Sequence, residues 1–167
     1  MSIATFATLL VGLTGCGREP ERRLASPEAT LATLLDSYGL RDASEHEVRR
    51  RLQRRERFTL VDAETFRACF ADHAGPVDEG AAGWLFGRLV ARKDGWRLEP
   101  DGADVVHVTV EEPNGRARLA TLVRDRRGQW KLSLARSVPP EVRAQLRVLY
   151  ERVRASHARL GAPSDPT

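Results

Sequence analysis

The side chains best suited to metal binding or proton transfer are few and scattered in this 167-residue chain, which has four histidines and two cysteines. No histidine stands at a recognised metal-ligand spacing from another histidine or cysteine, so the sequence predicts neither a metal site nor a bound cofactor. His107 is the best candidate for acid–base chemistry, because the valines of its alternating stretch face the other way. Trp84, which lies among glycines, is a second candidate for lining a pocket.

The two cysteines have different surroundings in the sequence. Cys69 shares a helical face with Phe66 and Phe70, which predicts a small buried apolar side chain rather than a reactive thiol. Cys16 follows an uncharged N-terminal segment with an apolar stretch from Ile3 to Leu13. That stretch is shorter than the roughly 20 residues needed to span a bilayer, but it has the length of a signal-peptide core. A buried terminal helix is the alternative interpretation.

The end of the apolar stretch, Leu13-Thr14-Gly15-Cys16, resembles the bacterial lipobox. The resemblance implies that Cys16 receives a diacylglyceryl lipid, that the chain is cut between Gly15 and Cys16, and that the mature protein is anchored in the cell envelope. Gly17, where an aspartate would imply inner-membrane retention, favours the periplasmic side of the outer membrane. The predicted organisation is a signal peptide at 1–15, a lipidated tether at 16–25, one domain at 26–160 and a disordered tail at 161–167.

Arginine dominates the basic residues of the chain. The formal net charge is +4, and only Lys93 and Lys131 among the 27 basic residues are lysines. Six arginines crowd into positions 49–57, namely Arg49, Arg50, Arg51, Arg54, Arg55 and Arg57. A solvated helix face, a contact with anionic lipid headgroups and a nucleic-acid surface are three interpretations. Export and the lack of interleaved aromatic residues disfavour nucleic acid, which would also require a misread N-terminus.

Helical spacing fills the first part of the chain, and strand alternation follows it. Helices are expected at about 27–39, 45–54, 63–72 and 79–91, strands at 96–98, 104–111, 116–124 and 129–136, and a long C-terminal helix at 140–160. An apolar stripe on this last helix includes Val142, Leu146, Leu149 and Val153. We therefore expect an α+β domain in which N-terminal helices pack on a curved antiparallel meander, with a long C-terminal helix added.

Two short motifs carry a second resemblance. Ser-Pro-Glu-Ala-Thr at 26–30 and Gly-Gln-Trp-Lys-Leu at 128–132 resemble segments of small bacterial lipoproteins with nuclear transport factor 2-like domains. The resemblance covers about residues 26–136 and implies a sheet that wraps around helices to form a cone. Enzymes of that fold often use a pocket Asp–His pair, so the resemblance also implies a pairing of His107 with Asp72 or Asp104.

The expected function is that of a membrane-anchored envelope lipoprotein whose domain binds a small ligand or an envelope protein, or has a structural role. One alternative hypothesis is an enzyme with an Asp/His acid–base pair in a pocket. The other is a cytoplasmic nucleic-acid binder. An enclosed polar pocket around His107 would favour the enzyme, and a sealed or apolar interior would favour a binding or structural role.

Overall fold

The computed structural model describes residues 22–54 and 56–160, with side-chain surroundings as far as Ser156. Its helices are α1 (Pro27–Asp36), α2 (Glu45–Gln53), α3 (Ala63–Ala68), α4 (Pro76–Val90), α5 (Leu134–Ser137) and α6 (Pro140–Leu160). Its strands are β1 (Arg97–Pro100), β2 (Val105–Glu112), β3 (Gly115–Arg124) and β4 (Trp130–Leu132). Gly15 and Cys16, for which cleavage and lipidation are predicted, lie outside the described residues, as do Arg55 and the tail at 161–167.

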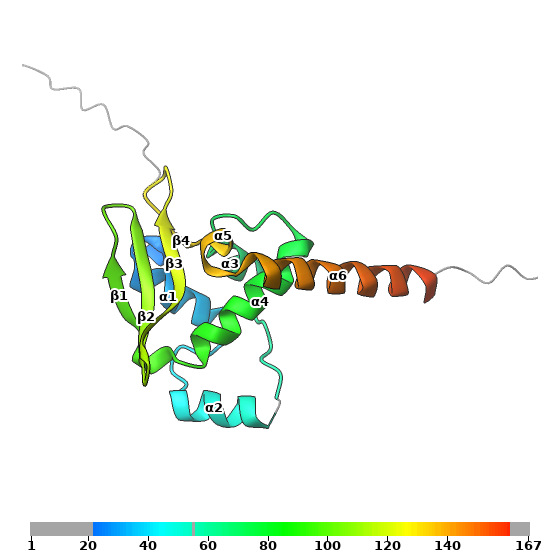
Figure 1. The fold of residues 1–167 in the computed structure, drawn as a ribbon, viewed down its shortest axis with the longest axis horizontal. Helices are drawn as coiled ribbons and strands as arrows, with labels where there is room; N and C mark the ends of the chain where they lie inside the picture. Colours follow the sequence, from blue (N-terminus) through cyan, green and yellow to red (C-terminus); the bar gives the residue numbers. More distant parts are fainter. Residues whose placement is uncertain (1–21, 55, 161–167) are drawn as a thin grey trace, which may run out of the picture.

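The four strands form one antiparallel sheet in the order β1-β2-β3-β4, so each strand pairs with its neighbour in sequence (Figure 1). Tight turns join β2 to β3 and β3 to β4, and each contains a glycine with positive φ, Gly115 at 115° and Gly128 at 77°. A bulge between Val108 and Thr109 shifts the register of β2 on β3. The meander and the α+β class are therefore as the sequence predicts.

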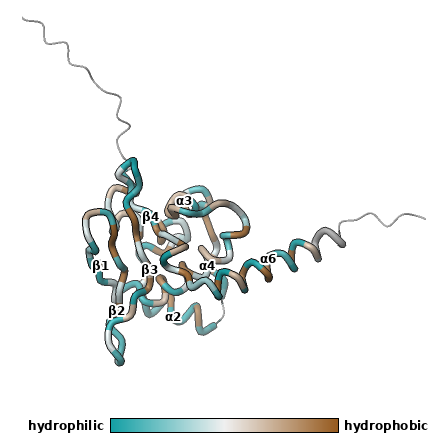
Figure 2. Tube along the Cα trace, turned by 45° about the horizontal axis from the view of Figure 1, so that its top comes forward, coloured by the Kyte–Doolittle hydropathy of each residue, from teal (hydrophilic) through white to brown (hydrophobic). Residues whose placement is uncertain are grey.

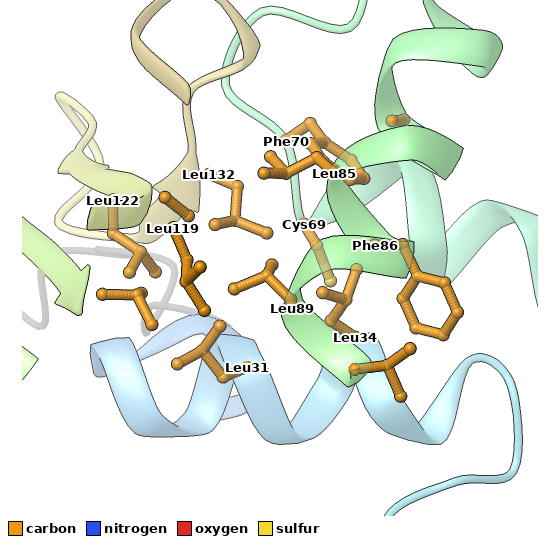
Figure 3. Packing of buried hydrophobic residues seen from close by; sticks show 14 of the residues in the cluster. Leu31, Leu34, Cys69, Phe70, Leu85, Phe86, Leu89, Leu119, Leu122 and Leu132 are labelled. Atoms are coloured by element: carbon orange, nitrogen blue, oxygen red, sulfur yellow. The ribbon is translucent and has the colours of Figure 1, made fainter. Parts of the chain in front are cut away.

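The hydrophobic core lies between one face of the sheet and helices α1 and α4. Val106, Val108 and Val110 of β2 are all buried, which confirms that the valine face of this strand points inward. Labelled core side chains in Figure 3 come from α1 (Leu31, Leu34), from α4 (Leu85, Leu89) and from the sheet (Leu119, Leu122, Leu132). Cys69 is fully buried in this cluster, as its position beside Phe66 and Phe70 predicts.

Side-chain caps begin the first three α-helices. Ser26 Oγ accepts a hydrogen bond from the Ala29 amide at 3.1 Å, and Ser44 Oγ accepts one from the Glu47 amide at 3.1 Å. Asp62 Oδ1 accepts one from the Thr65 amide at 2.9 Å, and hydrogen bonds from Thr65 hold the pKa of Asp62 below its usual range. Helix α4 begins at Pro76, three residues before the predicted start, because proline suits the first position of a helix.

The predicted strand at 129–136 is wrong in its second half, because β4 ends at Leu132 and α5 follows at once. Helix α3 is also shorter than predicted, because the chain after Ala68 runs beside β4 instead of continuing the helix. The Leu132 amide donates to the Cys69 carbonyl at 2.8 Å, and the Ala71 amide donates to the Leu132 carbonyl at 2.8 Å. This short parallel bridge joins the helical half of the chain to the sheet.

Helix α1 is also tied to β4, across a long stretch of sequence. The Thr30 hydroxyl donates to the Trp130 carbonyl at 2.7 Å, although the two residues are 100 positions apart.

Helix α6 follows α5 and extends away from the rest of the domain in both Figure 1 and Figure 2. Its first turns pack on α4, where a Cβ added at Gly80 would lie 3.5 Å from Leu146 Cβ.

Replacing leucine by alanine at one buried and at one exposed position should distinguish the core from the exposed part of α6. Leu89 is fully buried, so Leu89→Ala should lower the free energy of unfolding by about 2–5 kcal/mol. Leu149 is 57% exposed, so Leu149→Ala should change it by no more than about 0.5 kcal/mol. Urea unfolding followed by circular dichroism measures both. A loss at Leu149 as large as the loss at Leu89 would contradict this description of α6.

Candidate functional site

His107 is held between Asp101 and Thr121 on the sheet face opposite the core. Its Nε2 lies 3.0 Å from Asp101 Oδ2, and its Nδ1 lies 3.1 Å from Thr121 Oγ1. The expected pairing with Asp72 or Asp104 is therefore wrong, since the aspartate that contacts the ring comes from the loop between β1 and β2. An Asp–His–hydroxyl cluster is present, but with a partner that the sequence analysis did not identify.

The exposure of the three residues does not suit nucleophilic catalysis. Thr121 is 1% exposed, so its hydroxyl is closed to a substrate. The Asp101 side chain is 71% exposed and the His107 side chain 13%, so the open end of the cluster is the acid. A catalytic triad needs the opposite arrangement, in which the carboxylate is sheltered and the hydroxyl accessible. The cluster instead ties the β1–β2 loop to β3.

Ion pairs cover the sheet face around His107. Arg116 on β3 contacts both Glu111, at 2.9 Å, and Glu99, which lies opposite His107 in the β1–β2 register. Hydrogen bonding to Glu111 and the charges of both glutamates raise the pKa of Arg116. Because these charges satisfy one another, this face has the character of a solvated sheet surface.

Asp72 has a structural role where β4 is followed by α5. Its Oδ1 accepts a hydrogen bond from the Leu134 amide at 2.7 Å, and its Oδ2 accepts one from the Ala135 amide at 2.8 Å. The Ser133 hydroxyl donates to Oδ2 at 3.2 Å. Both oxygens of Asp72 are thus used to hold the first turn of α5, which sets where the chain turns from β4 towards α6.

Trp84 is half-buried on α4 and packs against the hydrophobic core. The guanidinium carbon of Arg88 lies 5.1 Å from the centroid of its ring, a cation–π distance. The ring therefore has protein contacts on the core side and on one face, and the structure does not bring it together with His107. These two candidate pocket residues belong to separate places in the fold.

The arginine run lies on and just after α2, of which only Val48 is buried. Three of its members have acidic partners: Arg49 pairs with Glu45, and Arg51 and Arg54 both pair with Glu56. The guanidinium of Arg51 also lies 5.0 Å from the ring centroid of Phe58. Arg50 and Arg57 are exposed. Much of the run is thus neutralised within its own segment, as expected of a solvated helix face.

The most distinctive surface is the part of α6 that extends beyond α4. Val142 and Leu146 are half-buried against the core, whereas Leu149 is 57% exposed and Val153 is 47% exposed. These four residues follow one another at spacings of four, three and four, so they form one continuous line along the helix. Val148 is 46% exposed, but it lies about 100° round the helix from Leu149. We call Leu149 and Val153 the distal face of α6.

The surroundings of the distal face are basic and shallow. The open surface beside Leu149 is formed by Ala144, Gln145, Val148 and Arg152, all of α6. The helix segment from Arg147 to Ser156 carries three arginines and one glutamate, Glu151. Figure 2 shows apolar and polar residues alternating along this exposed helix. The sequence predicts the stripe correctly, but the periodicity alone does not tell that only its first half is covered.

Within residues 22–54 and 56–160, no group of three or more acidic, histidine or cysteine side chains is arranged to hold a metal ion. Among the same residues, no helix has both the length and the apolar character needed to cross a membrane. No protein-family model, curated protein or solved structure matches this chain.

The cap formed by Asp72 can be tested against an exposed aspartate. Asp72→Ala should lower the free energy of unfolding by about 0.5–2 kcal/mol, because two amides of α5 lose their acceptor. Asp104→Ala, at an exposed position, should change it by no more than about 0.5 kcal/mol. The urea midpoint at neutral pH gives both values. Equal effects of the two substitutions would mean that Asp72 does not hold α5.

Proposed function

We propose that this protein is a lipid-anchored component of the bacterial cell envelope and that its domain is a non-enzymatic module that binds a partner protein through α6. The observation that carries the proposal is the half-exposed distal face, which continues a line of apolar residues whose first members are packed. A single helix extended into water has little stability of its own, because most helical stability comes from packing of an apolar face. A partner along this line would supply that packing.

The lipobox-like sequence supports the location. If Cys16 carries the lipid, it lies six positions before Arg22, where the described fold begins. An extended chain of that length reaches only about 20 Å, so the domain would stay close to the membrane surface. The partner would then be another envelope protein, and α6 would be available to it beside the membrane.

The enzyme alternative has less support. The Asp–His–hydroxyl cluster around His107 has a buried Thr121 and an exposed Asp101, an arrangement that suits a structural tie. The distal face of α6, in contrast, is apolar surface left open on a helix. Large exposed apolar side chains gathered on one element are typical of protein contacts.

Anchoring is tested by intact mass spectrometry and fractionation after expression in a Gram-negative host. The expected product begins at Cys16, carries a lipid-sized mass and sediments with membranes. Cys16→Ala should yield an unlipidated chain, and Cys69→Ala is the matched control that should keep the lipid. An unmodified chain that still begins with Met1 would contradict the anchor.

Partner binding is tested by placing a photo-crosslinking amino acid at Val153 in the anchored protein in living cells. The expected result is one discrete protein adduct that disappears when Leu149→Glu is introduced, because a charge there disrupts the apolar contact. The same amino acid at Arg126, in the exposed turn between β3 and β4, should give no such adduct. No adduct at Val153, or one that Leu149→Glu leaves unchanged, would contradict the proposed function.

A further inference from the structure

We propose that this protein binds a small amphipathic carboxylate, a molecule with an apolar body and one carboxylate head, in a pocket between α1 and β1. Strand β1 stands first in the sheet order, so only one of its edges is paired, and residues of α1 and β1 line one pocket beside it (Figure 1). Among the described residues, none of α6 lines this pocket. The site is therefore independent of the proposed function, and either can fail without the other.

The walls of the pocket are apolar and come from two elements. Leu31, Ala32 and Leu35 lie on one face of α1, because Leu35 follows the other two at four and three residues. Trp96 and Leu98, at the start of β1, form the wall on the side of the sheet. The pocket measures about 360 Å³, which lies within the roughly 300–1,000 Å³ of small-ligand sites. The apolar body of a small molecule therefore fits here.

Trp96 is held in place as part of this wall. Its Nε1 donates to the Leu89 carbonyl at 3.0 Å, so the one polar atom of the side chain is already used inside the protein. The rest of the half-buried indole packs against the core and lines the pocket. A ligand would meet an apolar surface that is already positioned, which reduces the ordering that binding requires.

Lys93 places a positive charge at one end of the pocket. It belongs to a short 3₁₀-helix, η2 (Lys93–Gly95), and its Nζ donates to the Arg41 carbonyl at 3.0 Å and to the Leu40 carbonyl at 3.5 Å. An ammonium group has three N–H donors, so one is left for a ligand. In the part of the chain that the structure describes, no carboxylate pairs with Lys93, whereas Lys131 lies 3.4 Å from Asp125. A half-buried charge of this kind is best satisfied by an anion.

The acids nearest in sequence are used elsewhere. Arg41 pairs with Asp36 at 3.2 Å, so these two charges offset each other. Asp94 follows Lys93 directly, but its Oδ2 accepts the Glu45 amide at the start of α2 at 2.8 Å. Lys93 therefore provides the net positive charge at this end of the pocket. The exposed guanidinium of Arg41 has further N–H groups for the same carboxylate.

Glu28 makes the other end of the pocket acidic. It lies on the same face of α1 seven residues before Leu35, a distance of about 10 Å along a helix. A second anionic group on the ligand would be repelled at that end. The pocket thus selects a ligand with a single anionic head, held at Lys93, and an uncharged body.

The free edge of β1 offers little to an extended peptide. The strand has four residues and ends in Pro100, whose nitrogen carries no hydrogen for a hydrogen bond between strands. An added strand depends on such backbone hydrogen bonds for its affinity. A small molecule in the pocket is therefore a better occupant than a peptide along the edge.

Binding is tested by nuclear magnetic resonance with octanoate, octanol and octylamine, which share an apolar body and differ in the charge of the head. The chain used is residues 16–167 with Cys16→Ala, labelled with ¹⁵N, and the indole N–H signal of Trp96 is assigned from Trp96→Phe. Octanoate should shift this signal saturably and bind about tenfold or more tightly than octanol, because a hydrogen bond to a charged group is gained. Octylamine should bind no more tightly than octanol.

Two pairs of variants locate the site. Lys93→Met should reduce the affinity for octanoate to that for octanol and leave octanol binding unchanged, which shows that the pocket itself is intact. Lys131→Met, at the other lysine, should leave octanoate binding unchanged. Ala32→Phe should abolish binding of both molecules by filling the pocket, and Ala155→Phe, at an exposed position of α6, should not. Circular dichroism and the urea midpoint check that each variant is folded.

Several outcomes would overturn the inference. Failure of all three molecules to shift the Trp96 signal would reject a ligand site in this pocket. Equal binding of octanoate and octanol, or of octanoate and octylamine, would reject recognition of a carboxylate. An equal loss of octanoate binding in Lys93→Met and Lys131→Met would mean that the carboxylate is not held at Lys93. The crosslinking result at Val153 has no bearing on any of these measurements, so the two proposals are tested separately.

Discussion

The short exchange of backbone hydrogen bonds between Leu132 and the segment around Cys69–Ala71 is the contact on which the rest of the structure depends. It joins the helical half of the chain to the last strand of the sheet. Asp72, the next residue, then holds the first amides of α5. The direction of α5 decides where α6 begins, and so decides how far the apolar line of α6 is covered by α4. A contact deep in the fold thus determines which apolar residues remain on the surface.

Local signals made most of the architecture predictable. The caps at Ser26, Ser44 and Asp62 act within three residues of themselves, so their effect can be identified in the sequence. The turn glycines and the alternating valines of β2 are likewise local. The strand beyond Leu132 was mispredicted because its end is set by Asp72, which is distant in sequence and close in space. Periodicity carries no information about such a partner.

The candidate sites also combine features that local sequence predicts with features that depend on residues distant in the sequence. The alternation of the strand predicts the side of the sheet on which His107 lies. It does not predict which aspartate contacts His107, because Asp101 comes from a loop whose path depends on the β1–β2 register. The stripe on α6 follows from helical spacing, but the number of its residues that α4 covers depends on where α4 begins, which is at Pro76 and not at residue 79. The lipid-anchor motif is a local pattern as well, and it stays a prediction.

The hydrogen bond from Thr30 to Trp130 has a consequence for the order of events during biosynthesis. Helix α1 is among the first elements to be made, yet its hydrogen bond to β4 can form only when a residue 100 positions later is available. Contacts between residues so far apart in sequence form late, and they slow folding. In a chain that emerges with its N-terminus first, this helix would lack its contact with the sheet until β4 has been made. That delay prolongs the unfolded state, the state in which a polypeptide can be threaded through a narrow channel.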